Sequence, residues 1–202
     1  PSWDFSRDGK AWQQVAVPHD WAISGPFDKK WDLQMVAIEQ NGETEKTEKS
    51  GRSGALPWIG EGMYKMNWTA PEGYKRAVLV FDGAMSQPVV SVNGKEAGKW
   101  AYGYNAFRID ITPFIQFGKS NLIEVHLNNV EESSRWYPGG GLYRPVSVEL
   151  YGNENFSTWD TFVRTLKADK QEAEVEVNAL LEGKTGKSGK TVIALLDEAG
   201  KK

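Results

Sequence analysis

Acidic side chains are the first candidates for chemistry in this chain, which holds 27 Asp and Glu residues. Hydrolysis of a glycosidic bond needs two carboxyl groups about 5–10 Å apart beside that bond, and no spacing in the sequence indicates such a pair. The adjacent residues Glu131 and Glu132 would point to opposite faces of an extended segment, which is typical of solvated charges. We therefore expect no catalytic residue within this chain.

The sequence contains few residues that could serve as thiol nucleophiles, histidine catalysts or metal ligands. The chain has no cysteine, which excludes thiolate nucleophiles, iron–sulfur clusters and cysteine zinc sites. Its two histidines, His19 and His126, are too few for a histidine-rich metal site, and no G-x-S-x-G nucleophile motif accompanies them. We expect no metal ligands and no required cofactor here. Bound sodium, magnesium or calcium in a longer parent protein stays open.

Length and charge limit the class of protein. The 202 residues suffice for one sandwich-sized domain and part of another, and the 40% of hydrophobic residues is typical of a globular chain. A net charge of −3 without a basic stripe argues against nucleic acid and anionic membranes as partners. No apolar run reaches the roughly 20 residues of a membrane span, and the N-terminus has no signal-peptide profile. A periplasmic or extracellular location of the parent protein stays open.

The elements that must position any site are strands, because apolar residues recur at every second position and helical periodicity is nearly absent. The apolar run 78–81 predicts a strand, and the run 89–92 followed by Asn93-Gly94 predicts a tight hairpin. In 122–128 the apolar side chains fall on one face, which leaves His126 on the solvated face. A last alternating run covers 146–151.

Two shifts in composition divide the chain. The polar stretch 40–54 predicts a mobile loop, since it is poor in apolar residues and punctuated by glycine. A turn-rich break at 152–155 marks a boundary, so we expect one domain over 1–152 and a second over 153–202. Runs at 159–166, 172–181 and 191–196 read as three strands of that second domain, too few to close a sandwich.

Four segments rich in aromatic residues and glycine carry a family resemblance. They are Val17–Trp21 (VPHDW), Gly60–Lys65 (GEGMYK), Gly98–Thr112 and Ser133–Val146, which contains GGGLYRPV. In this order they resemble the N-terminal sugar-binding, jelly-roll domain of family two glycoside hydrolases, the β-galactosidase and β-glucuronidase group. The similarity runs from about Trp3 to Tyr151, and the tail from Asn155 resembles the start of the immunoglobulin-like domain that follows in the family. Met63 stands where the family often has an aromatic residue.

The resemblance implies an all-β fold, a jelly-roll β-sandwich followed by a partial immunoglobulin-like sandwich. In the family, both catalytic glutamates lie in a later TIM barrel. The chain would thus be the non-catalytic N-terminal fragment of a retaining exo-glycosidase, helping to shape the pocket for a galactoside-type carbohydrate. A β-glucuronide or a β-mannoside is the alternative substrate. An autonomous carbohydrate-binding module and a purely structural sandwich that mediates homo-oligomer contacts are the alternative functions.

The resemblance also nominates two substrate-binding residues. In the family, the position six before the glycine of the G-[LI]-[YHF]-R turn, which is Gly141 here, points toward the barrel pocket and is often Asp. Here that position is Arg135, so the sequence departs from the pattern. Arg135 could donate hydrogen bonds to sugar hydroxyls while Trp136 offers a stacking face. The alternative is equally open, with Arg135 paired to Glu131 or Glu132 and Trp136 in the core.

The remaining motif residues receive structural interpretations first. Trp21 is expected to pack within the sheets at the end of a strand, and Gly139–Gly141 is expected to supply positive φ and close backbone approach in a turn. The aromatic residues Trp100, Tyr102 and Tyr104 could equally form an exposed sugar platform or pack between the sheets.

Overall fold

The computed structural model describes residues 2–51, 58–130, 139–183 and 190–201. Its fold class agrees with the sequence: the described residues form β-strands and short 3-10 turns, without an α-helix. The chain divides into two compact units, residues 1–151 and 152–202. No helix in the described ranges is long and apolar enough to cross a membrane.

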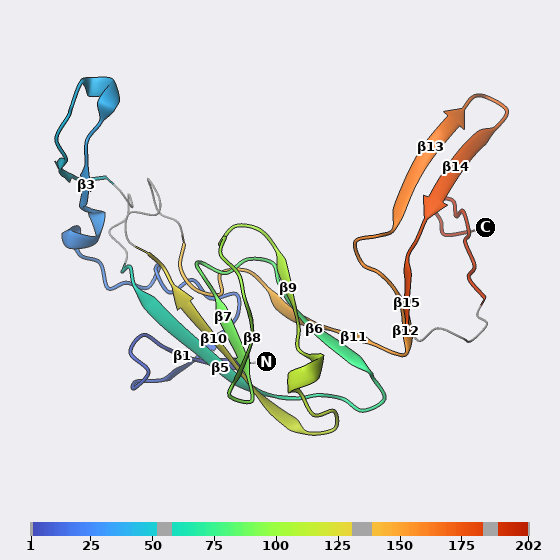
Figure 1. The fold of residues 1–202 in the computed structure, drawn as a ribbon, viewed down its shortest axis with the longest axis horizontal. Coiled ribbons are helices and arrows are strands. Elements are labelled where there is room, and N and C mark those ends of the chain that lie inside the picture. The colour runs from blue at the N-terminus through green and yellow to red at the C-terminus, as the bar shows by residue number, and fades with distance from the viewer. Residues whose placement is uncertain (1, 52–57, 131–138, 184–189, 202) are drawn as a thin grey trace. The chain divides into compact units, whose positions relative to one another are not determined.

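The first unit is a sandwich of two antiparallel sheets (Figure 1). The larger sheet has the order β2 (Gln13–Ala16), β1 (Ser2–Ser6), β5 (Glu61–Thr69), β10 (Ser120–Asn128), β7 (Val89–Val92) and β8 (Lys95–Lys99). The smaller sheet has the order β11 (Val146–Tyr151), β6 (Arg76–Phe81) and β9 (Phe107–Asp110). Because β1 lies between β2 and β5, the first strand of the chain is an interior strand of the larger sheet.

The core lies between these two sheets and follows from the period of two in the sequence. Apolar residues alternate along β10, so Ile123, Val125 and Leu127 are buried while His126 stays partly exposed, as the sequence predicts. The smaller sheet contributes its own buried residues to the same cluster, namely Ala77, Leu79, Phe81, Phe107 and Ile109. Burial of one face from each sheet is what stabilises a sandwich.

The predicted hairpin at Asn93-Gly94 is confirmed. Asn93 (φ 51°) and Gly94 (φ 76°) are both in the left-handed region, as a two-residue turn between twisted strands requires. The Asn93 side chain also donates to the Phe114 carbonyl over 2.9 Å and accepts from the Leu122 amide over 3.0 Å. The hairpin is therefore fixed to η3 (Thr112–Phe114) and to β10.

The expectation of a loop over 40–54 was wrong in part. Residues 47–49 form β4 (Thr47–Lys49), which pairs with β3 (Gln34–Val36), and η2 (Glu39–Asn41) lies between them; η1 (Lys29–Asp32) precedes β3. The side chains of this hairpin stay exposed or half-buried, so the hairpin forms without alternating apolar residues. Because the prediction of strands relied on that alternation, it missed this hairpin. Residues 52–54 of the stretch lie outside the described residues.

The second unit consists of two two-stranded antiparallel sheets. One pairs β12 (Glu154–Phe156) with β15 (Leu181–Gly183), and the other pairs β13 (Phe162–Ala168) with β14 (Ala173–Asn178). The strand expected at 191–196 is wrong: this segment is irregular, and Leu195 is 87% exposed. A run of β-forming residues becomes a strand only with a neighbour to share its hydrogen bonds, and no described strand pairs with it.

Candidate functional site

The two nominated site residues, Arg135 and Trp136, lie outside the described residues, as do Glu131 and Glu132. Their roles therefore stay predictions. What the structure does describe is the segment that follows them, Gly139–Leu142, and the elements that fix its position.

The glycines of this segment make the close backbone approach that the sequence predicts. Gly139 (φ 80°) and Gly141 (φ 96°) adopt the left-handed conformation. A Cβ atom at Gly140 would lie 2.8 Å from Cδ1 and Cε2 of Trp21, and one at Gly141 would lie 2.8 Å from the His19 carbonyl oxygen. Side chains larger than hydrogen are thus excluded at these positions.

The VPHDW segment holds this turn from one side. The His19 amide donates to the Leu142 carbonyl over 2.7 Å, and the Trp21 amide donates to the Gly140 carbonyl over 3.0 Å. The Asp20 carboxylate completes the connection, because its Oδ1 accepts from the amides of Gly140 (3.1 Å) and Ala22 (2.9 Å). Asp20 is thus a positioning residue for the turn.

The other side of the turn is hydrogen-bonded to the loop that precedes β7 and to the residue that follows β10. Met85 and Gly141 exchange two backbone hydrogen bonds of 3.0 and 2.9 Å. The buried Asn129 side chain donates from Nδ2 to the Gly139 carbonyl over 3.0 Å. The turn is consequently hydrogen-bonded on both flanks.

An aromatic cluster supports this arrangement from the core. Trp21 is fully buried, as expected, and its ring stacks on Phe5 (centroids 5.6 Å, interplanar angle 22°). Tyr64 lies against Phe5 at 4.8 Å, and its Oη is 2.8 Å from His19 Nδ1. Stacked and edge-on ring pairs add stability beyond their buried area.

Burial sets the protonation of the His19–Tyr64 pair. Desolvation raises the pKa of Tyr64 far above its ordinary value, so the phenol stays neutral. Desolvation also lowers the pKa of His19, which therefore stays neutral near pH 7. No local pattern in the sequence indicates this pair, because its members are 45 residues apart. A neutral imidazole bonded to a buried phenol has a structural role here.

The other histidine, His126, behaves as a residue of a solvated strand face. Its side chain is 42% exposed, and its Nε2 lies 3.1 Å from a carboxylate oxygen of Glu61 on the neighbouring strand. In the described residues, no group of three or more His, Cys, Asp or Glu side chains is arranged to hold a metal ion.

The aromatic rings of the loop between β8 and β9 are all partly exposed, and one of them stacks on the core. The Trp100 ring stacks on Phe107 at 5.6 Å with an angle of 7°, while the residue stays 40% exposed. Tyr102 is exposed to 58% and Tyr104 to 41%, and their ring centroids are 5.5 Å apart. The Tyr143 hydroxyl donates to the Gly103 carbonyl over 2.9 Å, which fixes the loop beneath the two exposed rings.

Comparisons with known proteins identify the relatives of this chain. It is 30% identical over 195 residues to the β-galactosidase BoGH2A of Bacteroides ovatus, covering 94% of the chain and 21% of that protein. It is 31% identical over 186 residues to a putative β-glucuronidase of Formosa agariphila, covering 89% of the chain and 16% of that protein. No family model matches the chain.

Solved structures agree with the sequence relatives. A glycosyl hydrolase family 2 member from Bacteroides cellulosilyticus matches with a TM-score of 0.73 and 29% identity over 89% of this chain and 24% of that one. A β-glycosidase from Bacteroides vulgatus matches with a TM-score of 0.72 and 26% identity, over 92% and 24%. The chain spans about a fifth of the length of these proteins. The chain therefore belongs to glycoside hydrolase family 2, in the N-terminal domain region of its β-galactosidases and β-glucuronidases.

Proposed function

We propose that this chain is the non-catalytic N-terminal part of a retaining exo-glycosidase and forms one wall of its sugar pocket. The proposal rests on the difference between the share of this chain that the matches cover and the share of the related proteins that they cover. Nearly the whole chain matches glycosidases, yet it accounts for only 16–24% of their length. The catalytic carboxylates would then belong to residues beyond the chain, in a barrel domain.

The geometry of the Gly139–Gly141 turn supports a positioning role. Arg135 and Trp136 precede the turn by only a few residues, and the turn is bonded to the VPHDW segment and to Met85. Our proposal is that the turn, fixed in this way, anchors the part of the pocket wall that Arg135 and Trp136 would form. Positioning of substrate groups is a recognised contribution to catalysis that requires no bond-breaking residue.

The substrate that we propose is a β-galactoside, with Arg135 donating hydrogen bonds to its hydroxyl oxygens and Trp136 stacking on the ring. The Ser133–Gly141 sequence (SSRWYPGGG) resembles the galactosidase branch, which supports this choice. The relatives carry both names, since BoGH2A is a β-galactosidase and the Formosa agariphila protein is named a putative β-glucuronidase. β-Glucuronides and β-mannosides are therefore included in the test.

The experiment compares the 202-residue chain with the product of the uninterrupted reading frame that contains it. Both proteins are assayed with nitrophenyl β-galactoside, β-glucuronide and β-mannoside, and the anomer released is followed by NMR. We expect no turnover by the chain alone and cleavage with retention of configuration by the longer product. Turnover by the chain alone, or a longer product inactive on all three glycosides, would refute the proposal.

The role of Arg135 is tested in the longer product with Arg135→Ala. Loss of a charged hydrogen bond in the transition state lowers kcat/KM about tenfold or more. Arg164→Ala is the matched control, because Arg164 lies on the exposed strand β13, where it pairs with Glu176 at 2.7 Å. Equal kcat/KM for both variants and the parent would remove Arg135 from the pocket wall.

A second function, autonomous carbohydrate binding, is favoured by one observation. Tyr102 and Tyr104 present exposed rings on a loop that is fixed by hydrogen bonds to Tyr143 and Arg144. Exposed aromatic faces are suited to stacking on sugar rings. If galactose or lactose at millimolar concentration shifts the NMR signals of these two rings in the isolated chain, this second function gains support; unchanged signals would refute it.

A further inference from the structure

The chain contains two Asn-Gly pairs, Asn41-Gly42 and Asn93-Gly94, and these two residue types can react with each other and then with water. The glycine nitrogen attacks Cγ of the asparagine side chain and closes a succinimide ring, while its proton leaves with the side-chain nitrogen as ammonia. Water then opens the ring at either carbonyl, which gives aspartate or isoaspartate without any oxidant or reductant. Glycine favours the attack because it has no Cβ to restrict its backbone or shield its nitrogen.

The fold holds Asn93 in a conformation that opposes this reaction. Its Nδ2 donates to the Phe114 carbonyl and to Oδ1 of the buried Asn121, both over 2.9 Å. Its Oδ1 accepts from the Leu122 amide over 3.0 Å. The side chain can turn toward the Gly94 nitrogen only after these three hydrogen bonds break. Ring closure at Asn93 therefore requires an opening of the hairpin and of the contacts behind it.

Asn41 is held much less firmly. It is the last residue of η2, a short 3-10 turn whose residues are all exposed. Its side chain hydrogen-bonds to the carboxylate of Glu43, and the Gly42 nitrogen donates to the Glu39 carbonyl over 2.9 Å. No atom of the described residues lies within 4 Å of a Cβ placed at Gly42, so the space beside this glycine is open. Ring closure at Asn41 breaks only hydrogen bonds at the surface.

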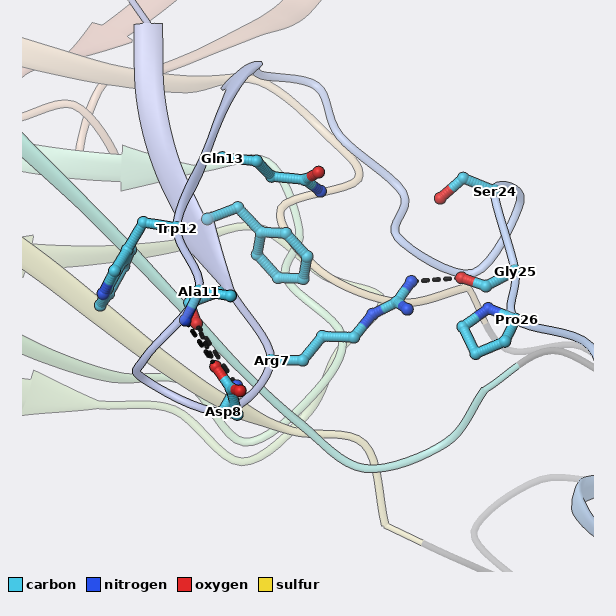
Figure 2. A pocket seen from close by; sticks show the side chains of 10 residues that line it. Arg7, Asp8, Ala11, Trp12, Gln13, Ser24, Gly25 and Pro26 are labelled. Atoms are coloured by element: carbon cyan, nitrogen blue, oxygen red, sulfur yellow. Dashed lines mark hydrogen bonds between the residues drawn. The ribbon is translucent and has the colours of Figure 1, made fainter.

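An Asp-Gly pair, Asp8-Gly9, could close the same ring with loss of water, and it provides an internal reference. The Asp8 carboxylate accepts from the Ala11 amide over 2.9 Å, as Figure 2 shows, and from the Lys10 amide over 2.8 Å. These hydrogen bonds lower the pKa of Asp8 to about 2 and keep it ionised. Because an ionised carboxylate resists attack by nitrogen, we expect Asp8 to stay unchanged while Asn41 reacts.

A carboxylate at position 41 would act on the group that closes the β3–β4 hairpin. Oε2 of Glu43 accepts from the Ile38 amide over 3.0 Å, and its Oε1 accepts from Lys49 Nζ over 3.0 Å. Because Lys49 belongs to β4, Glu43 connects the turn to the paired strands. The Asn41 amide now hydrogen-bonds to this carboxylate, whereas a carboxylate in its place would repel it. Isoaspartate would also add a methylene group to the backbone of the turn.

We propose that Asn41 is a site of spontaneous modification, converted by water into aspartate or isoaspartate, and that the new carboxylate loosens the β3–β4 hairpin. The same fold preserves Asn93. Both sites have the same Asn-Gly pair, so the difference comes from the hydrogen bonds that hold each side chain. The inference does not depend on the accessory function proposed above, because it concerns only residues of this chain.

The experiment follows both sites in the 202-residue chain during incubation at mildly alkaline pH and physiological temperature. Asn41 and Asn93 fall on different tryptic peptides, so mass spectrometry measures the conversion of each amide to an acid separately. In the folded chain we expect Asn41 to convert at least about tenfold faster than Asn93, because Asn93 must first lose its three side-chain hydrogen bonds. Enzymatic methylation of isoaspartate should label position 41 and leave Asp8 unlabelled.

The same incubation in urea separates the effect of the fold from that of the sequence. Unfolding removes the hydrogen bonds at both sites, so the two rates should become similar. Equal rates in the folded chain, faster conversion of Asn93, or a tenfold difference that persists in urea would overturn the proposal.

Two variants at position 41 test the effect on the hairpin. Asn41→Asp introduces the carboxylate directly, and Asn41→Gln is the matched control because it keeps an amide that closes the corresponding ring far more slowly. Amide hydrogen exchange over residues 34–49 should be about two- to tenfold faster in Asn41→Asp than in the parent, through loss of the hydrogen bond to Glu43. Asn41→Gln should exchange like the parent. Equal exchange in the two variants would overturn the loosening of the hairpin.

Discussion

Substitution of Gly140 by alanine tests how tightly the site turn is coupled to the core. The added Cβ would lie 2.8 Å from Cδ1 and Cε2 of Trp21, which is closer than real Cβ atoms approach other atoms. The indole ring cannot retreat, because a Cβ at Gly62 would already lie 2.7 Å from its Cε3 and the ring is fully buried. Either the turn or the ring must therefore move.

The size of the effect follows from these contacts. Overpacking of a well-packed core costs about 1–3 kcal/mol. For a chain of this length each kcal/mol lowers the melting temperature by about 2–4 °C, so Gly140→Ala should melt about 2–12 °C below the parent. The hydrogen bond from Gly140 to Asp20 is lengthened by the same displacement.

Thermal unfolding followed by tryptophan fluorescence measures this difference, and urea unfolding checks it at constant temperature. Gly152→Ala is the control, since no atom lies within 4 Å of its Cβ position and its φ is not positive. We expect the control to melt with the parent or slightly above it. A Gly140→Ala protein melting within about 1 °C of the parent would show that the turn is not packed on Trp21 as described.

Two further predictions concern the groups that hold the turn. Asp20→Ala leaves the amides of Gly140 and Ala22 without the carboxylate acceptor, so the free energy of unfolding measured in urea should fall by about 1–3 kcal/mol. Asp20→Asn keeps an acceptor oxygen and should recover most of that loss. Equal losses in the two variants would contradict this role of Asp20. Burial lowers the pKa of His19, so the unfolded state binds more protons below its pKa of about 6.5. The stability that the neutral His19 contributes should therefore be fully present above that pH and should be lost as the pH falls below it. The unfolding midpoint of His19→Asn should depend less on pH than that of the parent protein.

Local signals in the sequence predicted the local structure well. Asn93-Gly94 specifies its own turn through two residues that tolerate positive φ, and the alternation in 122–128 assigns each side chain of β10 to a face. Trp21 and the glycines at 139–141 were also interpreted correctly, because close packing of a large ring needs residues without side chains.

The failures share a physical cause, which is dependence on a distant partner. The run 191–196 has strand-forming residues but no described neighbour to pair with, and β4 forms despite polar residues because β3 lies beside it. The Asp20–Gly140 hydrogen bond joins residues 120 apart, and no local pattern encodes it. Arg135 and Trp136 were nominated from a family pattern alone and stay predictions.

The pairing of residues 19–21 with residues 140–142 also has a consequence for synthesis of the chain. The amides of His19 and Trp21 emerge from the ribosome about 120 residues before the carbonyls that accept their hydrogen bonds. Until then Trp21 lacks the glycine turn that covers it, and β1 waits for β5. A nascent chain that stops before residue 139 would therefore leave uncovered the side of the Trp21 indole that the glycine turn packs against.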